Sequence, residues 1–268
     1  MKKAFKFFDV TLRDGIQTSK KIYTLNEKKQ LLHSIMNNYK PLHVEVGSLV
    51  SKKVLPQMNN SMELYNYAVE KYPKSNFYML IPNIKYLKEG VNNGVNNFSF
   101  ITSVSNEFQK KNTNMELYKA KNELNHMIRY VDKNCNKSIK KLYVSCINEC
   151  PIAGKIENIR IVEELLYYKH NYSFDNICLS DTCGTLSYED MVKIIEMTIR
   201  YGMSPNQLSI HLHLGNKDKE KLIKMIKFLS YIRINMFDVS TLENSGGCSV
   251  TIDEGKTRRN LTYDDLNM

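Results

Sequence analysis

Short apolar runs alternate with longer stretches of helical periodicity along the whole chain. Each run is rich in β-branched and aromatic residues and is bounded by polar or turn residues, which is the pattern of a buried strand. Eight runs are predicted as strands: residues 6–10, 42–48, 77–81, 98–103, 141–145, 176–180, 208–213 and 236–241.

The stretches between these runs repeat their apolar residues with a period near 3.6, which predicts amphipathic helices. In the first, Leu25, Leu32 and Ile35 fall on one side, with Glu and Lys residues opposite. We expect Asn114 to cap the second. The predicted helices span residues 24–39, 115–131, 156–168, 188–201 and 219–232.

Strands that alternate with helices indicate βαβ units and a parallel sheet. Eight strands in 268 residues favour an α/β fold of the closed (β/α)8 type, a TIM barrel, over an open sheet. No G-x-G-x-x-G motif follows the first strand, so a dinucleotide fold has no support. We expect one catalytic domain over residues 1–268, with the last βα unit shortened.

The composition limits the classes of partner that the protein is expected to bind. The net charge is +10, but Lys residues are scattered without a basic tail, so we expect an anionic small ligand and no nucleic acid. No apolar run approaches the roughly 20 residues of a membrane span. The six cysteines form no CxxC pair, and the chain has no sequence typical of a leader peptide before Asp9, so we expect a cytoplasmic protein.

Polar residues gather where each predicted strand ends. In TIM barrels the chemistry lies at this end of the strands. One alternative for the first strand is a simple turn at Asp14–Gly15, but all eight ends carry reactive or hydrogen-bonding groups. In strand order they are Arg13 and Asp14, Glu45 and Ser48, Pro82 and Asn83, 105–112, 143–146, 180–182, His211 and His213, and 245–248.

His211 and His213 are the sharpest pair among these residues. Residues i and i+2 of a strand point to the same face, about 6.6 Å apart, so both rings can reach one ion. With a carboxylate from another strand end, the donors are nitrogen and oxygen. This set suits Mg²⁺ or Mn²⁺, and Zn²⁺ is a further option.

Other residues at the strand ends allow two interpretations each. Glu45 on a buried strand needs a partner, and Arg13 is the natural one, so Glu45 either orients Arg13 or acts directly. Asp181 is either a turn residue or a contact to substrate. Cys248 differs from the other cysteines because two glycines precede it and allow a mobile loop over the barrel mouth.

The ordered set of motifs resembles the metal-dependent TIM-barrel superfamily that holds isopropylmalate and homocitrate synthases and, with most similarity, 3-hydroxy-3-methylglutaryl-CoA lyase. "DVTLRDGIQ" is similar to the first-strand motif, and "VEVGSLVSKKVLPQM" to the lyase's second-strand segment. "IPN", "FQKKN", "YVSCINECPIAGKI" and "SDTCG" follow in the same order. "HLH" resembles the metal histidines, and "GGC" resembles the lyase's catalytic cysteine loop, which the synthases lack.

The resemblance implies a mechanism. A divalent cation, Mg²⁺ or Mn²⁺, would be held by Asp14, His211, His213 and Asn260. His211, or as second choice Asp14, would take the hydroxyl proton. Arg13, oriented by Glu45, would stabilise the enolate, and Cys248 would protonate it with a thiol more acidic than a free one.

The same resemblance implies contacts to an acyl-CoA substrate. Residues expected to position the acyl group are Gln17, Ser48, Tyr143, Ser145, Asp181 and Thr182. Those expected at the CoA phosphates are Lys110, Lys111 and Asn112.

Two departures keep alternatives open. Leu214 stands where the family usually has Asp after the histidine pair, and the segment after "GGC" is longer and charged. A Claisen-type synthase and a non-catalytic barrel that binds CoA or a partner therefore remain alternatives to the lyase. The family's C-terminal region contributes to dimerisation, so a homodimer is also open.

Overall fold

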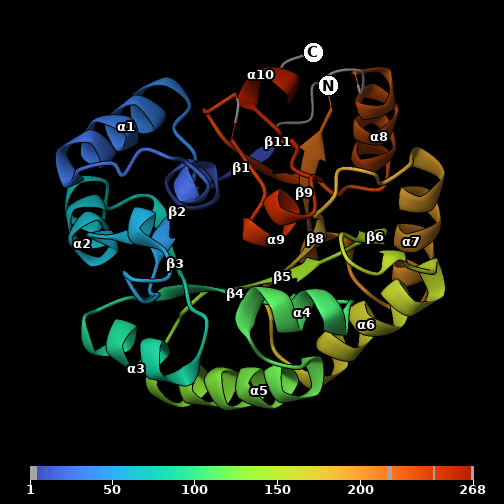
Figure 1. Cartoon of the computed structure of the whole chain (residues 1–268), viewed down its shortest axis with the longest axis horizontal. Coiled ribbons are helices and arrows are strands. Elements are labelled where there is room, and N and C mark those ends of the chain that lie inside the picture. Colours follow the sequence, from blue (N-terminus) through green and yellow to red (C-terminus); the bar gives the residue numbers. More distant parts are fainter. Residues whose placement is uncertain (1–4, 216–218, 244, 267–268) are drawn as a thin grey trace.

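A closed barrel of parallel strands forms the centre of the protein (Figure 1). The computed structural model describes residues 5–215, 219–243 and 245–266. The strands follow the order β10-β1-β2-β3-β4-β5-β8-β9, and β9 also pairs with β10, which closes the barrel. All eight predicted strands are confirmed, with ends that differ by at most two residues: β1 (Lys6–Asp9), β2 (His43–Ser48), β3 (Asn76–Leu80), β4 (Asn97–Ser103), β5 (Lys140–Ser145), β8 (Asn176–Asp181), β9 (Leu208–Leu214) and β10 (Met236–Val239).

Helices surround this barrel on its outside (Figure 1). The five predicted helices are confirmed as α1 (Leu25–Asn38), α5 (Leu117–Asn134), α6 (Asn158–Asn171), α7 (Tyr188–Arg200) and α8 (Lys219–Tyr231). In α1, Thr24 and Glu27 form a capping box, and Leu32 and Ile35 are fully buried. The apolar core lies between these helices and the outward faces of the strands.

Three helices between β2 and α5 were not predicted from the sequence: α2 (Ser61–Lys71), α3 (Ile84–Asn92) and α4 (Asn106–Thr113). The expected cap at Asn114 is wrong. Asn114 adopts a left-handed conformation that ends α4, and α5 begins after Glu116. The Asn83 side chain accepts a hydrogen bond from the Tyr86 amide, so this strand-end residue caps α3.

The chain after β10 forms short elements in place of a long outer helix. These are α9 (Ser249–Asp253), β11 (Arg259–Asn260) and α10 (Tyr263–Leu266), so the prediction of a shortened last βα unit is confirmed for the described residues. β11 pairs antiparallel with β9, with Asn260 opposite His213. This pairing brings a late segment of the chain to the end of β9.

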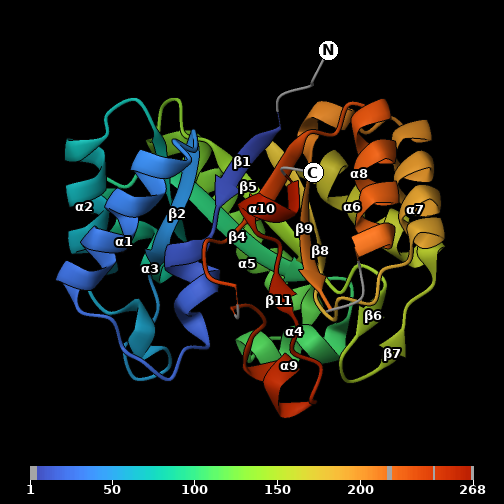
Figure 2. The same cartoon turned by 90° about the horizontal axis from the view of Figure 1, so that it is seen from above.

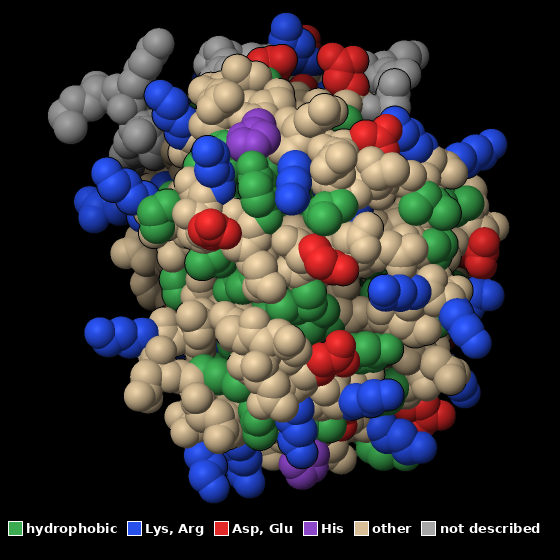
Figure 3. All heavy atoms as spheres, turned by 90° about the vertical axis from the view of Figure 1, so that its left-hand side faces the viewer, with side chains coloured by type: hydrophobic (Ala, Val, Ile, Leu, Met, Phe, Trp, Pro, Cys, Tyr) green, Lys and Arg blue, Asp and Glu red, His purple; other side chains and the backbone are tan. Residues whose placement is uncertain are grey.

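One end of the barrel carries α4, α9 and the hairpin of β6 (Glu149–Cys150) and β7 (Gly154–Lys155), as Figure 2 shows. β1 begins toward the opposite end. On the face that carries α1 and α2, Lys and Arg side chains are spread singly between Asp and Glu side chains (Figure 3). No helix among the described residues is long and apolar enough to cross a bilayer.

Candidate active site

The first strand leads directly into the site through an unusual turn. Residues Thr11–Gly15 form a single π-helical turn after β1, and such turns are frequent at functional sites. A Cβ at Gly15 would lie 2.8 Å from the Ser240 hydroxyl oxygen, so glycine lets the turn pack closely against the residue that follows β10. The turn buries Arg13 and Asp14 at the barrel mouth, so the two residues belong to a site and not to a surface turn.

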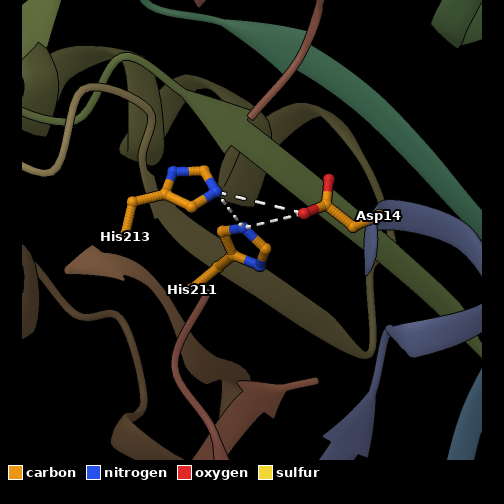
Figure 4. A group of neighbouring side chains, drawn as sticks. All are labelled: Asp14, His211 and His213. Atoms are coloured by element: carbon orange, nitrogen blue, oxygen red, sulfur yellow. Dashed lines mark hydrogen bonds and ion pairs between the residues drawn. The ribbon is translucent and has the colours of Figure 1, made fainter. Parts of the chain in front are cut away.

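Asp14, His211 and His213 direct three potential ligand atoms at one point (Figure 4). Oδ2 of Asp14 lies 4.0 Å from Nε2 of His211 and 4.0 Å from Nε2 of His213. The two Nε2 atoms are 3.3 Å apart. All three side chains are buried, and the spacing of their ligand atoms, all within 4.8 Å of one another, suits a single metal ion.

The other ring nitrogen of each histidine faces an acceptor. His213 Nδ1 lies 3.0 Å from the carbonyl oxygen of Asp181, and His211 Nδ1 lies 3.3 Å from Oδ2 of Asp238. An acceptor at Nδ1 favours the tautomer that carries its proton there and leaves the Nε2 lone pair for an ion. The backbone amide of Gly247 donates to Nε2 of His213, which agrees with this tautomer.

Asn260 adds a fourth group to the cluster. Its Nδ2 donates to Oδ2 of Asp14 at 2.8 Å. Its Oδ1 is buried and has no hydrogen-bond partner among the described residues. A buried amide oxygen without a partner is costly, and an ion beside Asp14 would satisfy it. Two imidazoles, a carboxylate and an amide oxygen fit a divalent cation.

Arg13 is held between two carboxylates. Its Nε donates to Glu45, and its Nη1 lies 2.6 Å from Oδ1 of Asp14. Burial would lower the pKa of Arg13, but Glu45 and Asp14 outweigh it and raise that pKa well above its usual value. For Asp14, burial alone would raise the pKa, but Arg13 and His213 hold that pKa well below its usual range. Both groups are therefore charged at neutral pH.

Tyr143 closes the other side of this group. Its ring lies 5.0 Å from the Arg13 guanidinium carbon, and its hydroxyl donates to Oε2 of Glu45 at 3.3 Å. Burial, together with Asp238 and Glu45, raises its pKa well above the usual value, so the phenol is a neutral donor. Glu45 itself is fully buried beneath Arg13 and does not line the cavity.

A cavity of about 490 Å³ opens above these residues. Many residues predicted for catalysis, metal binding or substrate binding line it: Arg13, Asp14, Gln17, Ser48, Asn112, Tyr143, Ser145, Thr182, His211, His213 and Cys248. The segment after β2 contributes Val54, Leu55 and Pro56 as an apolar wall. These residues lie within the motif similar to the lyase's second-strand segment, but none of them was predicted as a site residue. A polar floor and an apolar wall are typical of a small-molecule site.

Three of the predicted substrate residues lie outside this cavity. The Asp181 carboxylate accepts the amides of Thr185 and Leu186, so it stabilises the turn after β8, and burial raises its pKa to about 6. Lys110 and Lys111 are exposed on α4 and form ion pairs with Glu116 and Asp253. A role for these two at the CoA phosphates stays a prediction.

Cys248 lies over the cavity, at the start of α9. Its loop is tied to the barrel, because Gln17 donates to the Gly247 carbonyl at 2.7 Å and Thr18 donates to that of Gly246. Burial raises the pKa of the thiol, so the greater acidity expected of it would have to come from a bound cation and stays a prediction. The glycines serve close packing: a Cβ at Gly246 would lie 2.8 Å from the Arg258 carbonyl oxygen.

The sequence analysis also missed a buried ion pair beneath His211. Lys141 and Asp238 are almost completely buried, and their charged groups are 2.5 Å apart. The signal was available, because a charged residue inside a buried strand needs a partner. Which residues would meet across the barrel could not be read from the chain.

Comparison with known proteins places the chain among lyase relatives. The HMGL-like family model matches residues 4–216. A mitochondrial hydroxymethylglutaryl-CoA lyase of Macaca fascicularis is 29% identical over 79% of this chain and 63% of that protein. A cytoplasmic 3-hydroxy-3-methylglutaryl-CoA lyase of Rattus norvegicus is 27% identical over 91% of this chain and 68% of that protein. The chain thus spans about two thirds of the length of these relatives.

Solved structures share the fold. An HMG-CoA lyase from Acenitobacter baumannii, in complex with coenzyme A and 3-methylmalate, matches with a TM-score of 0.86 at 22% identity, over 98% of this chain and 82% of that one. An HMG-CoA lyase from Pseudomonas aeruginosa matches with a TM-score of 0.84 at 22% identity, over 99% and 84%. These likenesses show a (β/α)8 barrel.

Proposed function

Because the chain belongs to the HMGL-like family, we propose that it is a divalent-metal-dependent carbon–carbon lyase. Its substrate is 3-hydroxy-3-methylglutaryl-CoA or a related 3-hydroxyacyl-CoA, and the products from the former are acetyl-CoA and acetoacetate. One observation carries this proposal: Cys248, Arg13 and the group of Asp14, His211 and His213 open on the same cavity. Residues 1–268 act as a single catalytic domain.

Asp14, His211, His213 and Asn260 would hold the cation, for which we propose Mg²⁺ or Mn²⁺. When bound, such an ion would supply positive charge beside the substrate's oxygens and would make the hydroxyl proton easier to remove. The unpartnered Oδ1 of Asn260 supports its place in this set.

His211 is the first candidate for the base that takes the hydroxyl proton. Asp14 is the weaker candidate because its pKa lies well below the usual range. Nε2 of His211 faces the cavity, and Asp238 behind Nδ1 would stabilise the charge that a proton brings to the ring. Nε2 serves as the base only when it is not bound to the ion.

Cleavage moves two electron pairs and two protons. The base takes the hydroxyl proton while the O–H electron pair forms the C3 carbonyl of acetoacetate, and that proton later restores the Cys248 thiol. As the C2–C3 bond breaks, its electrons pass to C2 and into the thioester, where negative charge develops on oxygen. Arg13 stabilises that oxygen, since its charge is fixed by Glu45 and Asp14. The Cys248 thiol then donates its proton to C2, and its raised pKa keeps that proton in place until it is needed.

The remaining cavity residues orient the substrate. Gln17, Ser48, Tyr143, Ser145 and Thr182 offer hydroxyl or amide groups around the polar floor. Asn112 lies at the cavity with Lys110 and Lys111 on the same helix, so we propose that this end of α4 meets the CoA phosphates. The coenzyme A in the Acenitobacter baumannii lyase supports this ligand class.

The test is turnover of 3-hydroxy-3-methylglutaryl-CoA by the purified chain with Mg²⁺ or Mn²⁺, followed as acetoacetate release. We expect acetoacetate with metal and none after chelation. No acetoacetate with either metal would refute the lyase. Condensation of acetyl-CoA with an oxo acid would then identify a synthase, and CoA-ester binding without either reaction would identify a non-catalytic barrel.

A further inference from the structure

The two histidines of the site are oriented by acceptors of different kinds. His213 faces the neutral backbone carbonyl of Asp181, whose position is fixed by β8. His211 faces the side chain of Asp238 on β10, which carries a charge and could in principle turn. The orientation of His211 therefore depends on whatever holds Asp238.

Lys141 holds Asp238 from the far side of the barrel. It lies on β5, and its Nζ donates to Oδ1 of Asp238 at 2.5 Å, which leaves Oδ2 for His211. The Cys178 thiol adds a weaker bond to Oδ2 at 3.7 Å. The Lys141 ammonium lies 3.5 Å from the centre of the Phe8 ring and 4.6 Å from that of Tyr143, so aromatic faces stabilise it in a site without water access.

This arrangement has the same plan as the Arg13 side of the site. Glu45 lies beneath Arg13 and fixes it, and Asp238 lies beneath His211. Only Asp238 is in turn held by a buried lysine. A simple barrel-stabilising ion pair would not need one carboxylate oxygen to be left facing a ring nitrogen.

We infer that Asp238 and Lys141 are positioning residues that set the tautomer of His211, so that its Nε2 lone pair faces the site. The inference deepens the proposed function and rests on it for the identity of the ion. A merely structural pair would leave the His211 tautomer independent of residue 238. If residue 238 instead sets the tautomer, the His211 proton should lie on Nδ1 when residue 238 accepts there and on Nε2 when residue 238 donates.

Asp238→Asn should reverse this character. With Lys141 present, the amide oxygen of the new side chain must face the ammonium, so its NH₂ group faces Nδ1 of His211. Nδ1 then has to accept, and the proton moves to Nε2, where it blocks metal binding. In the double variant Asp238→Asn with Lys141→Met, no cation fixes the amide, so its oxygen can turn back to His211 and restore the original tautomer.

The test is the ring-nitrogen spectrum of His211 in the metal-free protein, measured by long-range proton–nitrogen correlation at pH 8 and assigned by the signals lost in His211→Ala. Mn²⁺ affinity by calorimetry is the second readout. Asp132→Asn is the matched control, since Asp132 pairs with the neighbouring Lys140 on the outside of the barrel.

We expect the wild type and the control to carry the proton on Nδ1, and Asp238→Asn to carry it on Nε2 with roughly 10–100-fold weaker Mn²⁺ binding. The double variant should regain the Nδ1 proton and much of the affinity. A folded Asp238→Asn variant that still carries the proton on Nδ1 would overturn the inference. If that single variant does not fold, a double variant that carries the proton on Nε2 would overturn it instead. Should the wild type bind no divalent cation, the proposed function would fail, while the tautomer would still decide this inference.

Discussion

The site is made of two regions that are built differently. The ends of β1, β2 and β9 supply Arg13, Asp14, Glu45, His211 and His213. The segment 245–266 supplies Cys248 and Asn260. β11 within it pairs antiparallel with β9, and the part around Cys248 is fixed by hydrogen bonds and ion pairs. The strand-borne group is buried and held by the parallel ladder, whereas the C-terminal segment lies over it. Groups that bind an ion need fixed geometry, and a proton donor that meets the substrate tolerates a loop.

The strand-borne region should show the largest effect. His213→Ala removes one of three buried ligands. We therefore expect Mn²⁺ affinity to fall by more than the ~100-fold that is lost when a residue hydrogen-bonded to a metal ligand is removed. Calorimetry measures it. His126→Ala, an exposed histidine on α5, is the control and should bind normally. Normal binding by His213→Ala would place the ion elsewhere.

Arg13 should affect turnover rather than metal affinity. Arg13→Met removes the charge that faces the developing oxyanion, and we expect kcat to fall about 10²–10³-fold. Glu45→Gln keeps the shape but weakens the hold on Arg13, so its effect should be smaller. Steady-state kinetics measures both, with Arg129→Met on the surface of α5 as the control. A larger loss of kcat in Glu45→Gln than in Arg13→Met would mean that Glu45 acts directly in the reaction and does not only orient Arg13.

Asp9 tests how the C-terminal segment is anchored, because it accepts the Tyr263 hydroxyl at 2.8 Å. Burial raises its pKa to about 6, above the unfolded value of about 4. The folded state thus binds more protons in this window, so this group lowers the free energy of unfolding as pH rises from 4 to 6, by up to about 3 kcal/mol.

Asp9→Asn cannot titrate, so the stability of the variant relative to wild type should improve between pH 4 and 7. Urea unfolding at both pH values measures this difference. Asp264→Asn, an exposed carboxylate on α10, should leave the pH dependence as it is. A parallel pH dependence in Asp9→Asn and wild type would show that Asp9 is already ionised at pH 4.

The smallest effect should come from the ion pair between Lys256 and Glu149, which links the Cys248 segment to the β6–β7 hairpin. Half-exposed pairs contribute less than about 1 kcal/mol, so Lys256→Gln should speed alkylation of Cys248 by less than about five-fold. High salt should produce the same increase in the wild type but not in the variant. Lys227→Gln on α8 is the control, and an equal response to salt in Lys256→Gln and wild type would remove the pair from this role.

The strand-borne region could be predicted from the sequence much better than the segment above it. Apolar runs located all eight strands, and the rule that barrel chemistry lies at strand ends located Arg13, Asp14 and the histidine pair. The half-buried position of Cys248 could not be predicted, because it depends on packing between residues distant in sequence. The pairing of Lys141 with Asp238 joins strands about 100 residues apart. Asn114 was misjudged because the same residue type starts helices and ends them.

Both regions must work together if the chain is a lyase, and one measurement tests this most directly: acetoacetate release from 3-hydroxy-3-methylglutaryl-CoA with Mn²⁺, by wild type, Cys248→Ala and Cys183→Ala. Cys183 is a buried thiol that lies outside the cavity lining. We expect turnover by the wild type and the Cys183 variant, and a ~10²–10⁴-fold loss in Cys248→Ala at unchanged Mn²⁺ affinity. Full activity in Cys248→Ala, or no acetoacetate from the wild type, would contradict the account.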